Sequence, residues 1–252
     1  MPTLRVMTYN VRQCTVARCG GAIGRVADVI AEAAPDLVAL QEVAVLNPRA
    51  GAIDQAAALG AALGMHTFFQ PAMSGPERGA YGNAILSRTP FRLMRGGLLP
   101  LLPERPLREP RGVAWLALAG GVELHVVATH LGLSRRERHA QLDALLGPEW
   151  LGDPRCGPPR VLLGDLNFVP GAREHQRLER VLRDALREVA PEGGHRATFP
   201  SLRPLVRLDH VFVSQDVHVL RTQVLRAPGL RRVSDHLPVV VDLELPAAGE
   251  TA

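Results

Sequence analysis

Short apolar segments rich in β-forming residues recur along the whole chain, and this pattern limits the possible folds more than any other feature of the sequence. Their lengths and turn-like boundaries predict strands over 4–10, 37–41, 84–87, 113–118, 122–129, 161–163, 208–214 and 239–243. Segment 37–41 is almost entirely apolar, which is expected of a strand covered on both faces. Many strands, few helices and short polar connections therefore indicate two packed sheets with helices on their outer faces.

Helical signals occur in four places between these strands. We predict helices between Ile23 and Pro35, between Asp54 and Gly64, from Ser134 onward, and over 178–189. Asp54 and Gly64 are typical of the two ends of a helix. Residues 134–137 form a capping box, and residues 178–189 carry an apolar stripe at helical spacing.

The composition is that of a globular protein with a substantial core. With 252 residues, 46% of them hydrophobic and 21% charged, the chain is not typical of disordered, collagen-like or disulfide-dense proteins. We predict one domain over 1–252, with a frayed tail from about residue 247. No apolar run approaches the roughly 18 residues of a membrane helix, so we expect no stable membrane insertion. The absence of a leader pattern and the odd number of cysteines, 3, favour a cytoplasmic monomer without a disulfide framework.

The basic residues are all arginine, and the formal net charge is +4. Arginine binds phosphate oxygens through two parallel hydrogen bonds, which makes an anionic substrate plausible. A genome that favours arginine codons would produce the same composition. Net charge alone is therefore weak support for nucleic-acid binding.

Polar residues capable of chemistry stand at the ends of the predicted apolar strands. They are Asn10, Glu42, His130, Asp165, Asn167, Asp209, Asp235 and His236. Carboxylate and amide oxygens are the ligands that suit Mg²⁺ or Mn²⁺. Asp165 and Asn167 are two residues apart, so on extended backbone their side chains share one face. Asp235 and His236 place an anionic ligand beside a titratable base.

Seven segments around these residues resemble the endonuclease/exonuclease/phosphatase family, which includes pancreatic deoxyribonuclease, apurinic endonucleases, neutral sphingomyelinases and inositol polyphosphate 5-phosphatases. The segments are TYNV (8–11), LQEV (40–43), GNAILS (82–87), ATHL (128–131), GDLN (164–167), RLDHVFV (207–213) and SDHLP (234–238). They follow the family order and cover nearly the whole chain. The resemblance implies a four-layered α-β-β-α sandwich of two mixed, mainly antiparallel sheets with helices on the outer faces, and a Mg²⁺-dependent phosphoesterase site.

The resemblance also implies a role for each matching residue. Asn10, Glu42 and Asp235 match metal-site residues, with Glu42 the direct carboxylate ligand. His236 matches the histidine that acts as general base or electrostatic clamp on the attacking water, held by Asp209.

Four further residues complete this implied site. Asp165 and Asn167 match the pair that orients the nucleophile and the scissile phosphate, and His130 matches a position that contacts phosphate or serves as general acid. Asn83 is a candidate phosphate contact, although a turn role explains it nearly as well. Arg111 lies in a Pro-rich connection that either closes over the site or is simply solvated, and the same holds for Arg108.

Other conspicuous residues have ordinary explanations. We interpret as surface or hydrogen-bonded histidines His66, His125, His139, His175, His195 and His218. His210 alternates to the face opposite Asp209, which favours a role in the core. Cys14 and Cys19 lack a second ligand pair for zinc and are expected to be free thiols. Segment 97–111 is apolar and then basic, so it either forms a strand edge on the core or touches a lipid surface.

The sequence therefore predicts a divalent-metal-dependent phosphoester hydrolase, a phosphodiesterase, nuclease or phosphatase, in which a metal- and His-activated water attacks a phosphate ester. Its cofactor is Mg²⁺ (or Mn²⁺), and its substrate is a nucleic acid, a phospholipid head group or a small phosphorylated metabolite. The few aromatic residues, 4% of the chain, lower the expectation of a nuclease. The alternative is a catalytically silent sandwich that binds an anionic partner through an Arg-rich rim.

Overall fold

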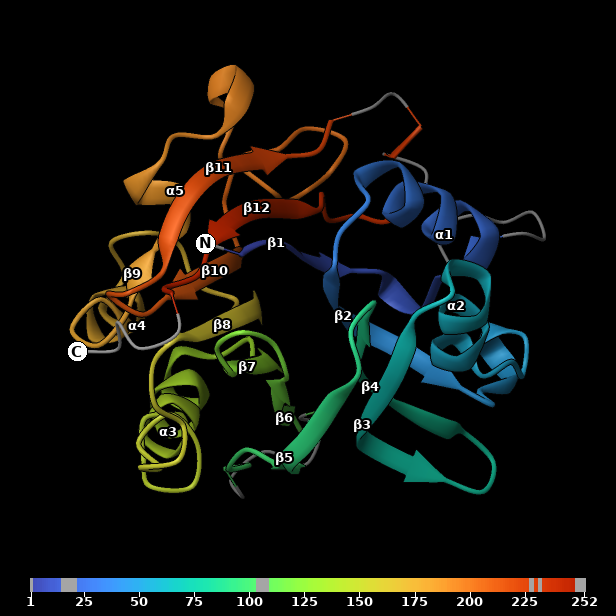
Figure 1. The fold of residues 1–252 in the computed structure, drawn as a ribbon. Coiled ribbons are helices and arrows are strands. Elements are labelled where there is room, and N and C mark those ends of the chain that lie inside the picture. Colours follow the sequence, from blue (N-terminus) through green and yellow to red (C-terminus); the bar gives the residue numbers. More distant parts are fainter. Residues whose placement is uncertain (1, 15–21, 103–108, 227–228, 231–232, 248–252) are drawn as a thin grey trace.

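Two six-stranded sheets packed face to face form the centre of the protein (Figure 1). The computed structural model describes residues 2–14, 22–102, 109–226, 229–230 and 233–247. In spatial order, the first sheet consists of β11 (His218–Val224), β12 (Val239–Glu244), β1 (Thr3–Asn10), β2 (Leu37–Val45), β4 (Gly79–Ser87) and β3 (His66–Gly75). The second consists of β5 (Phe91–Leu98), β6 (Gly112–Leu118), β7 (Leu124–His130), β8 (Arg160–Asp165), β10 (Asp209–Val213) and β9 (Arg183–Asp184).

Helices cover the outer faces of both sheets. The described helices are α1 (Ala22–Ala33), α2 (Gln55–Leu63), α3 (Arg135–Leu145), α4 (Arg173–Leu178) and α5 (Ala185–Glu188), with 3₁₀ turns η1 (Arg12–Cys14), η2 (Pro48–Ala50) and η3 (Glu192–Gly194). Helix α1 connects the parallel strands β1 and β2, and α3 connects the parallel strands β7 and β8. Figure 1 shows α1 and α2 beside the first sheet and α3 beside the second. The layers are therefore α-β-β-α, as the sequence predicted.

The second sheet shows why its central strands read as continuous apolar runs. In β6, Ala114 and Leu116 face the core between the sheets, whereas Val113 and Trp115 pack with the helices on the outer face. Every residue of β6 and β7 is buried. Because both faces are covered, side chains that alternate in direction are mostly apolar.

Most predicted elements are confirmed, including their ends. Asp54 caps α2 by accepting a hydrogen bond from Ala57 N, and Gly64 ends it with a left-handed φ of 64°. Ser134 caps α3 by accepting from the backbone N–H of Glu137.

The prediction of one helix over 178–189 is wrong. Helix α4 ends at Leu178, residues 183–184 pair with β10 as strand β9, and α5 begins only after Asp184. Asp184 is buried, and its side chain accepts from the backbone of Leu186 as well as from other polar groups described below. A buried carboxylate needs several donors, and satisfying them interrupts the helix that the apolar stripe suggested.

Only the first two residues of segment 97–111 lie in a strand, at the end of the edge strand β5, and residues 99–102 and 109–111 form no strand. Leu99 is buried, whereas Leu98 and Leu101 are exposed.

Some predictions fall on residues that the structure does not describe. These are Arg108, Cys19 and the predicted frayed tail beyond residue 247. Cys14 is described, and it is a buried free thiol. In the part of the chain that the structure describes, no helix is both long and apolar enough to cross a membrane.

Strand direction brings the polar strand ends to one edge of the sandwich. The parallel strands β7 and β8 end at His130 and Asp165, and β10 starts at Asp209 opposite Asp165 because it runs antiparallel to β8. In the first sheet, β1 ends at Asn10 beside β2, and antiparallel β12 begins just after His236.

Candidate active site

Asn10 joins the two sheets at this edge. Its side-chain Nδ2 donates to Glu42 Oε1 at 2.9 Å and to Asp165 Oδ2 at 3.0 Å, and its Oδ1 accepts from the backbone N–H of Arg12. Asn10 is 1% exposed, so these bonds are shielded from water. One amide therefore holds a carboxylate of the first sheet beside a carboxylate of the second.

Glu42 reaches Asn10 because strand β2 is irregular there. The register between β2 and β4 shifts between Leu40 and Val43, and Glu42 itself has a φ of 58°, in the left-handed region. An extra residue in one strand re-aims the following side chains. The irregularity turns a carboxylate toward the site that regular alternation would not place beside Asn10.

His236 and Asp209 form a buried carboxylate–imidazole pair. His236 Nδ1 lies 2.9 Å from Asp209 Oδ2, and His236 Nε2 lies 3.6 Å from Asp165 Oδ2. Burial lowers the pKa of His236, but the charge and hydrogen bond of Asp209, together with the charges of Asp165 and Asp235, outweigh it and raise the pKa to about 10. Burial and the Asp209 charge raise the pKa of Asp165.

His130 is neutral, and donors face both of its ring nitrogens. Burial, and then the charge of Arg111, lower the pKa of His130 well below its usual value. Arg111 Nη1 lies 3.1 Å from His130 Nδ1, and Asn167 Nδ2 lies 3.0 Å from His130 Nε2. His130 Nε2 also lies 3.5 Å from Asp165 Oδ2. The low pKa of His130 disfavours the general-acid role.

Asp165 and Asn167 lie together at the end of β8. Asp165 Oδ1 accepts a hydrogen bond from the backbone N–H of Asn167. Asn167 Nδ2 donates to the carbonyl of Leu131 at 2.9 Å, and the same Nδ2 lies 3.0 Å from His130 Nε2. Gly164 makes this arrangement possible, because a Cβ at that position would lie 1.8 Å from the carbonyl oxygen of Thr129. The close approach of β7 and β8 therefore requires glycine directly before Asp165.

Asp235 lies at the exposed side of the site. Its Oδ2 pairs with Arg12 Nη1 at 2.9 Å, and both side chains are partly exposed. The backbone of Ser234 and Asp235 is fixed by Ser201, whose Oγ donates to the carbonyl of Ser234 and whose N–H donates to that of Asp235. Ser234 Oγ in turn donates to the carbonyl of Asn10.

Asn83 and Arg111 are buried on the other side of His130. Asn83 Nδ2 donates to the carbonyl of Gly112 at 2.9 Å. Arg111 pairs with Glu109 as well as with His130, and its Nε has no hydrogen-bond partner among the described residues. Substrate contact by either residue stays a prediction.

Two residues in contact with the site were not singled out from the sequence. The ring of Phe199 lies 4.9 Å from that of His236, and Arg12 pairs with Asp235. Arg12 follows Asn10 by two residues, a position close enough to a site strand to be suspected. Phe199 gives no such signal, because it is 37 residues from His236 and a loop brings it there.

The residues present fit a divalent cation such as Mg²⁺ or Mn²⁺. One ligand atom from each of Asp165, Asp209 and His236 lies within 4.8 Å of the others, and Asn10 holds Glu42 against this group. Asp209 Oδ1 is buried without a hydrogen-bond partner among the described residues. Several carboxylates in a shielded place, one of them with a buried oxygen that lacks a hydrogen-bond partner among the described residues, are the hard donor set that these cations require. Carboxylates at the site outnumber the cationic groups paired with them.

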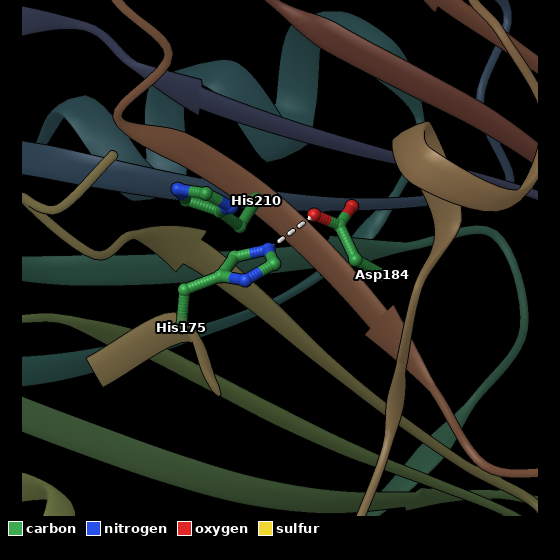
Figure 2. A group of neighbouring side chains, drawn as sticks. All are labelled: His175, Asp184 and His210. Atoms are coloured by element: carbon green, nitrogen blue, oxygen red, sulfur yellow. Dashed lines mark hydrogen bonds and ion pairs between the residues drawn. The ribbon is translucent and has the colours of Figure 1, made fainter. Parts of the chain in front are cut away.

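A second cluster of metal-ligand type lies elsewhere in the second sheet, where Figure 2 shows His175, Asp184 and His210. His175 Nε2 lies 2.6 Å from Asp184 Oδ2, and His210 Nε2 bonds to the carbonyl of Phe168. The guanidinium of Arg207 bonds to both oxygens of Asp184. A cation already occupies the carboxylate, so we interpret this cluster as a structural network. The expectations of a hydrogen-bonded His175 and a core His210 are confirmed.

The arrangement around His236 defines a class of protein. A buried carboxylate–imidazole pair, surrounded by further carboxylates at the edge of a two-sheet sandwich, is suited to metal-assisted hydrolysis of phosphate esters. The family assignment agrees with this chemistry. A model of the Endonuclease/Exonuclease/phosphatase family matches residues 7–236, and the chain belongs to this family of phosphoester hydrolases.

Individual relatives are similar to the chain in sequence or in structure. The uncharacterized protein YbhP of Escherichia coli K12 is 31% identical over 173 residues, which cover 68% of this chain and 65% of YbhP. An endonuclease/exonuclease/phosphatase from Beutenbergia cavernae is 28% identical with a TM-score of 0.79, covering 100% of this chain and 74% of that chain. The mannosyl-6-phosphatase of Bacteroides thetaiotaomicron is 21% identical with a TM-score of 0.74, covering 96% of this chain and 100% of that chain, and shows the fold alone.

Proposed function

We propose that the protein hydrolyses phosphate mono- or diesters with the help of Mg²⁺ or Mn²⁺. The observation that carries the proposal is the contact sequence Asp209–His236–Asp165–Asn10–Glu42, which places an oriented base and several carboxylates in one shielded site. Membership of a phosphoester-hydrolase family supports it.

Glu42, Asp235 and Asn10 Oδ1 would hold the cation, with Asp165 and Asp209 in reach of it. Bound there, a divalent cation neutralises charge on the phosphoryl oxygens and favours attack at phosphorus. Asn10 contributes further by fixing Glu42 and Asp165 relative to each other through its two N–H groups.

His236 is proposed to take the proton of the attacking water at Nε2. Its Nδ1–H donates to Asp209, which fixes the ring and leaves Nε2 pointing toward Asp165. The same carboxylates that raise the pKa of His236 are the proposed neighbours of the cation. When their charge is compensated, the pKa of His236 falls toward neutrality, where a general base works best.

His130, Asn167 and Arg111 are proposed to position the phosphate. The imidazole of His130 and the amide of Asn167 stand at the rim of the site, and Arg111 contacts the other ring nitrogen of His130, so that Asn167 and Arg111 supply donors there. Donors fixed before the reaction stabilise the charge that develops on the phosphoryl oxygens.

The test is release of nitrophenol from bis-nitrophenyl phosphate and nitrophenyl phosphate with Mg²⁺ or Mn²⁺, repeated with chelator. We expect chelation to abolish turnover, and His236→Ala and Asp165→Asn each to lower it about 10²-fold or more while the fold is retained. Asp242→Asn is the matched control, because Asp242 pairs with Arg5 on the first sheet and has no contact with the site. Activity that ignores chelation contradicts the metal mechanism. Hydrolysis of no ester favours a silent binding module.

A further inference from the structure

Large apolar side chains are exposed on four loops beside the proposed active site. The loops are 98–102, after β5; 131–135, after β7; 166–173, after β8; and 199–206, before β10. Their most exposed members are Leu133 (74%), Leu202 (70%), Leu205 (70%), Leu98 (56%), Leu101 (45%) and Val169 (41%). We call these six side chains the apolar rim.

Backbone contacts show that the four loops are neighbours. The N–H of Leu166 donates to the carbonyl of Leu208, which joins the loop after β8 to the segment before β10, and the N–H of Leu131 donates to the carbonyl of Asp165. Gln141 bridges the remaining pair, since its Oε1 accepts from Gly132 N and its Nε2 donates to the carbonyl of Pro100. The loops that carry the apolar rim therefore lie side by side along this edge of the sandwich.

The loops also enclose the proposed catalytic residues. Phe199 packs its ring against His236, and Leu205 lies in the same loop, held by a backbone bond to Phe199. Asn167 donates to the carbonyl of Leu131, two residues before Leu133. The loops that carry the apolar rim therefore border the proposed site.

The charges on these loops have a single sign. Arg135, Arg173 and Arg203 are exposed, and each stands within four residues of a rim side chain. The four loops contain no aspartate and no glutamate. Apolar side chains interleaved with arginine, without acidic residues, are the composition of surfaces that bind anionic lipid interfaces.

The exposed apolar residues elsewhere in the described chain form a pair at most in the contacts seen. Leu46 and Ile53 are joined by a backbone hydrogen bond, and Met73 lies on β3. Leu93, Val181 and Leu220 lie on β5, after α4 and on β11, respectively. Single exposed apolar residues are ordinary and need no explanation, whereas a contiguous group marks an interaction site.

We propose that the apolar rim and its three arginines dock the protein on anionic phospholipid bilayers. Docking places the active site against the head groups, so that phosphate esters of lipid head groups are the substrate class. The assignment of the substrate class rests on the proposed function, whereas docking on the bilayer does not. The leucines enter the interface and the arginines contact lipid phosphates, without any segment crossing the bilayer.

The test is co-sedimentation of the purified protein with vesicles, in chelator so that binding does not depend on the active site. We expect binding to phosphatidylglycerol–phosphatidylcholine vesicles and much weaker binding to phosphatidylcholine alone. Leu202→Ser with Leu205→Ser lowers the partition coefficient at least about tenfold. Arg135→Gln, Arg173→Gln and Arg203→Gln together lower it on the order of a hundredfold on anionic vesicles, at about fivefold per arginine.

Leu220→Ser is the matched control, because Leu220 is 49% exposed on β11 and lies outside the rim. It should bind vesicles like the unmodified protein. Absence of vesicle binding, or binding that the two leucine substitutions leave unchanged, overturns the proposal. So does a dimer in light scattering that the same substitutions dissociate, because the rim would then join two copies of the chain.

The soluble-ester assay separates this proposal from the proposed function. Hydrolysis of bis-nitrophenyl phosphate without vesicle binding overturns docking and leaves the hydrolase. Vesicle binding without hydrolysis of any ester supports docking and overturns the hydrolase. If both occur, release of the head group from vesicle phospholipid supports the substrate class, and hydrolysis confined to soluble esters overturns it.

Discussion

Replacing Asp209 with asparagine tests the central pair of the proposed site. Asp209 Oδ2 lies 2.9 Å from His236 Nδ1, and both side chains are buried. Asparagine has nearly the same shape, but its amide can donate to Nδ1, which moves the ring proton to Nε2. His236 then presents a proton where the proposed chemistry requires a lone pair.

The expected effect follows from the cost of a wrong tautomer. The corresponding change in a Ser-His-Asp triad lowers kcat about 10⁴-fold, and a general base contributes about 10²- to 10⁴-fold. We expect Asp209→Asn to lower kcat within this range, which adds about 3–5 kcal/mol to the activation free energy. Because Asp209 is proposed to act through His236, KM should change less than about threefold.

The assay is the initial rate with bis-nitrophenyl phosphate and Mg²⁺ or Mn²⁺, measured from about pH 5 to pH 10 to cover the working range of an imidazole base. Asp209 raises the pKa of His236, so its loss lowers that pKa. The residual activity should therefore begin to rise at a lower pH, because a base works once it has lost its proton. Asp242→Asn should keep both the rate and the pH profile.

The reasoning would be refuted by a folded Asp209→Asn protein that turns over within about threefold of the unmodified rate with the same pH profile. Such a result would remove proton transfer by His236 from the rate-limiting step. Circular dichroism and the thermal midpoint establish that the variant is folded.

Three further predictions concern the framework of the site. Gly164→Ala should cost about 1–3 kcal/mol or more of unfolding free energy, because its Cβ would meet the carbonyl of Thr129 at 1.8 Å, and urea unfolding measures this. Burial, and then Arg207, lower the pKa of His210 to about 3, so the folded protein keeps it neutral while the unfolded chain binds a proton below about pH 6.5. The unfolding free energy should then fall by up to about 1.4 kcal/mol for each unit by which the pH is lowered from about 6.5 to about 3. His210→Gln should flatten this pH dependence. Asp184→Asn should destabilise by about 3–5 kcal/mol because Arg207 loses its counter-charge, and adding Arg207→Met should restore part of the loss in thermal melts.

Interior strands were predictable from the sequence, and edge strands were not. The strands that no pattern revealed, β3, β5, β9 and β11, are the four sheet edges. Strand β11 alternates buried and exposed residues, and β5 is largely exposed, so neither carries a continuous apolar run. An edge strand contacts fewer neighbours and tolerates polar residues, and its sequence therefore resembles a loop.

The membership of the site was more predictable than its details. Polar residues at the ends of apolar strands are conspicuous, and the structure brings Asn10, Glu42, Asp165 and His236 into one group. The neutral state of His130 depends on its burial and on Arg111, which precedes it by 19 residues and belongs to the neighbouring strand segment. Such properties arise from side-chain packing across the sheets, which spacing along the chain does not encode.

Backbone conformation explains why a pattern of strands and turns is insufficient at the site. Glu42 and Asn167 both have left-handed φ values, 58° and 53°. Asparagine adopts this region readily, but for glutamate it costs about 1–2 kcal/mol. The rest of the fold must supply that free energy, and the fully buried strands β6 and β7 are part of what does so. Local sequence preference would keep Glu42 in a regular strand. Its hydrogen bond to Asn10, made between two strands of the first sheet and next to Asp165 of the second, exists because packing of the whole sandwich overrides that preference.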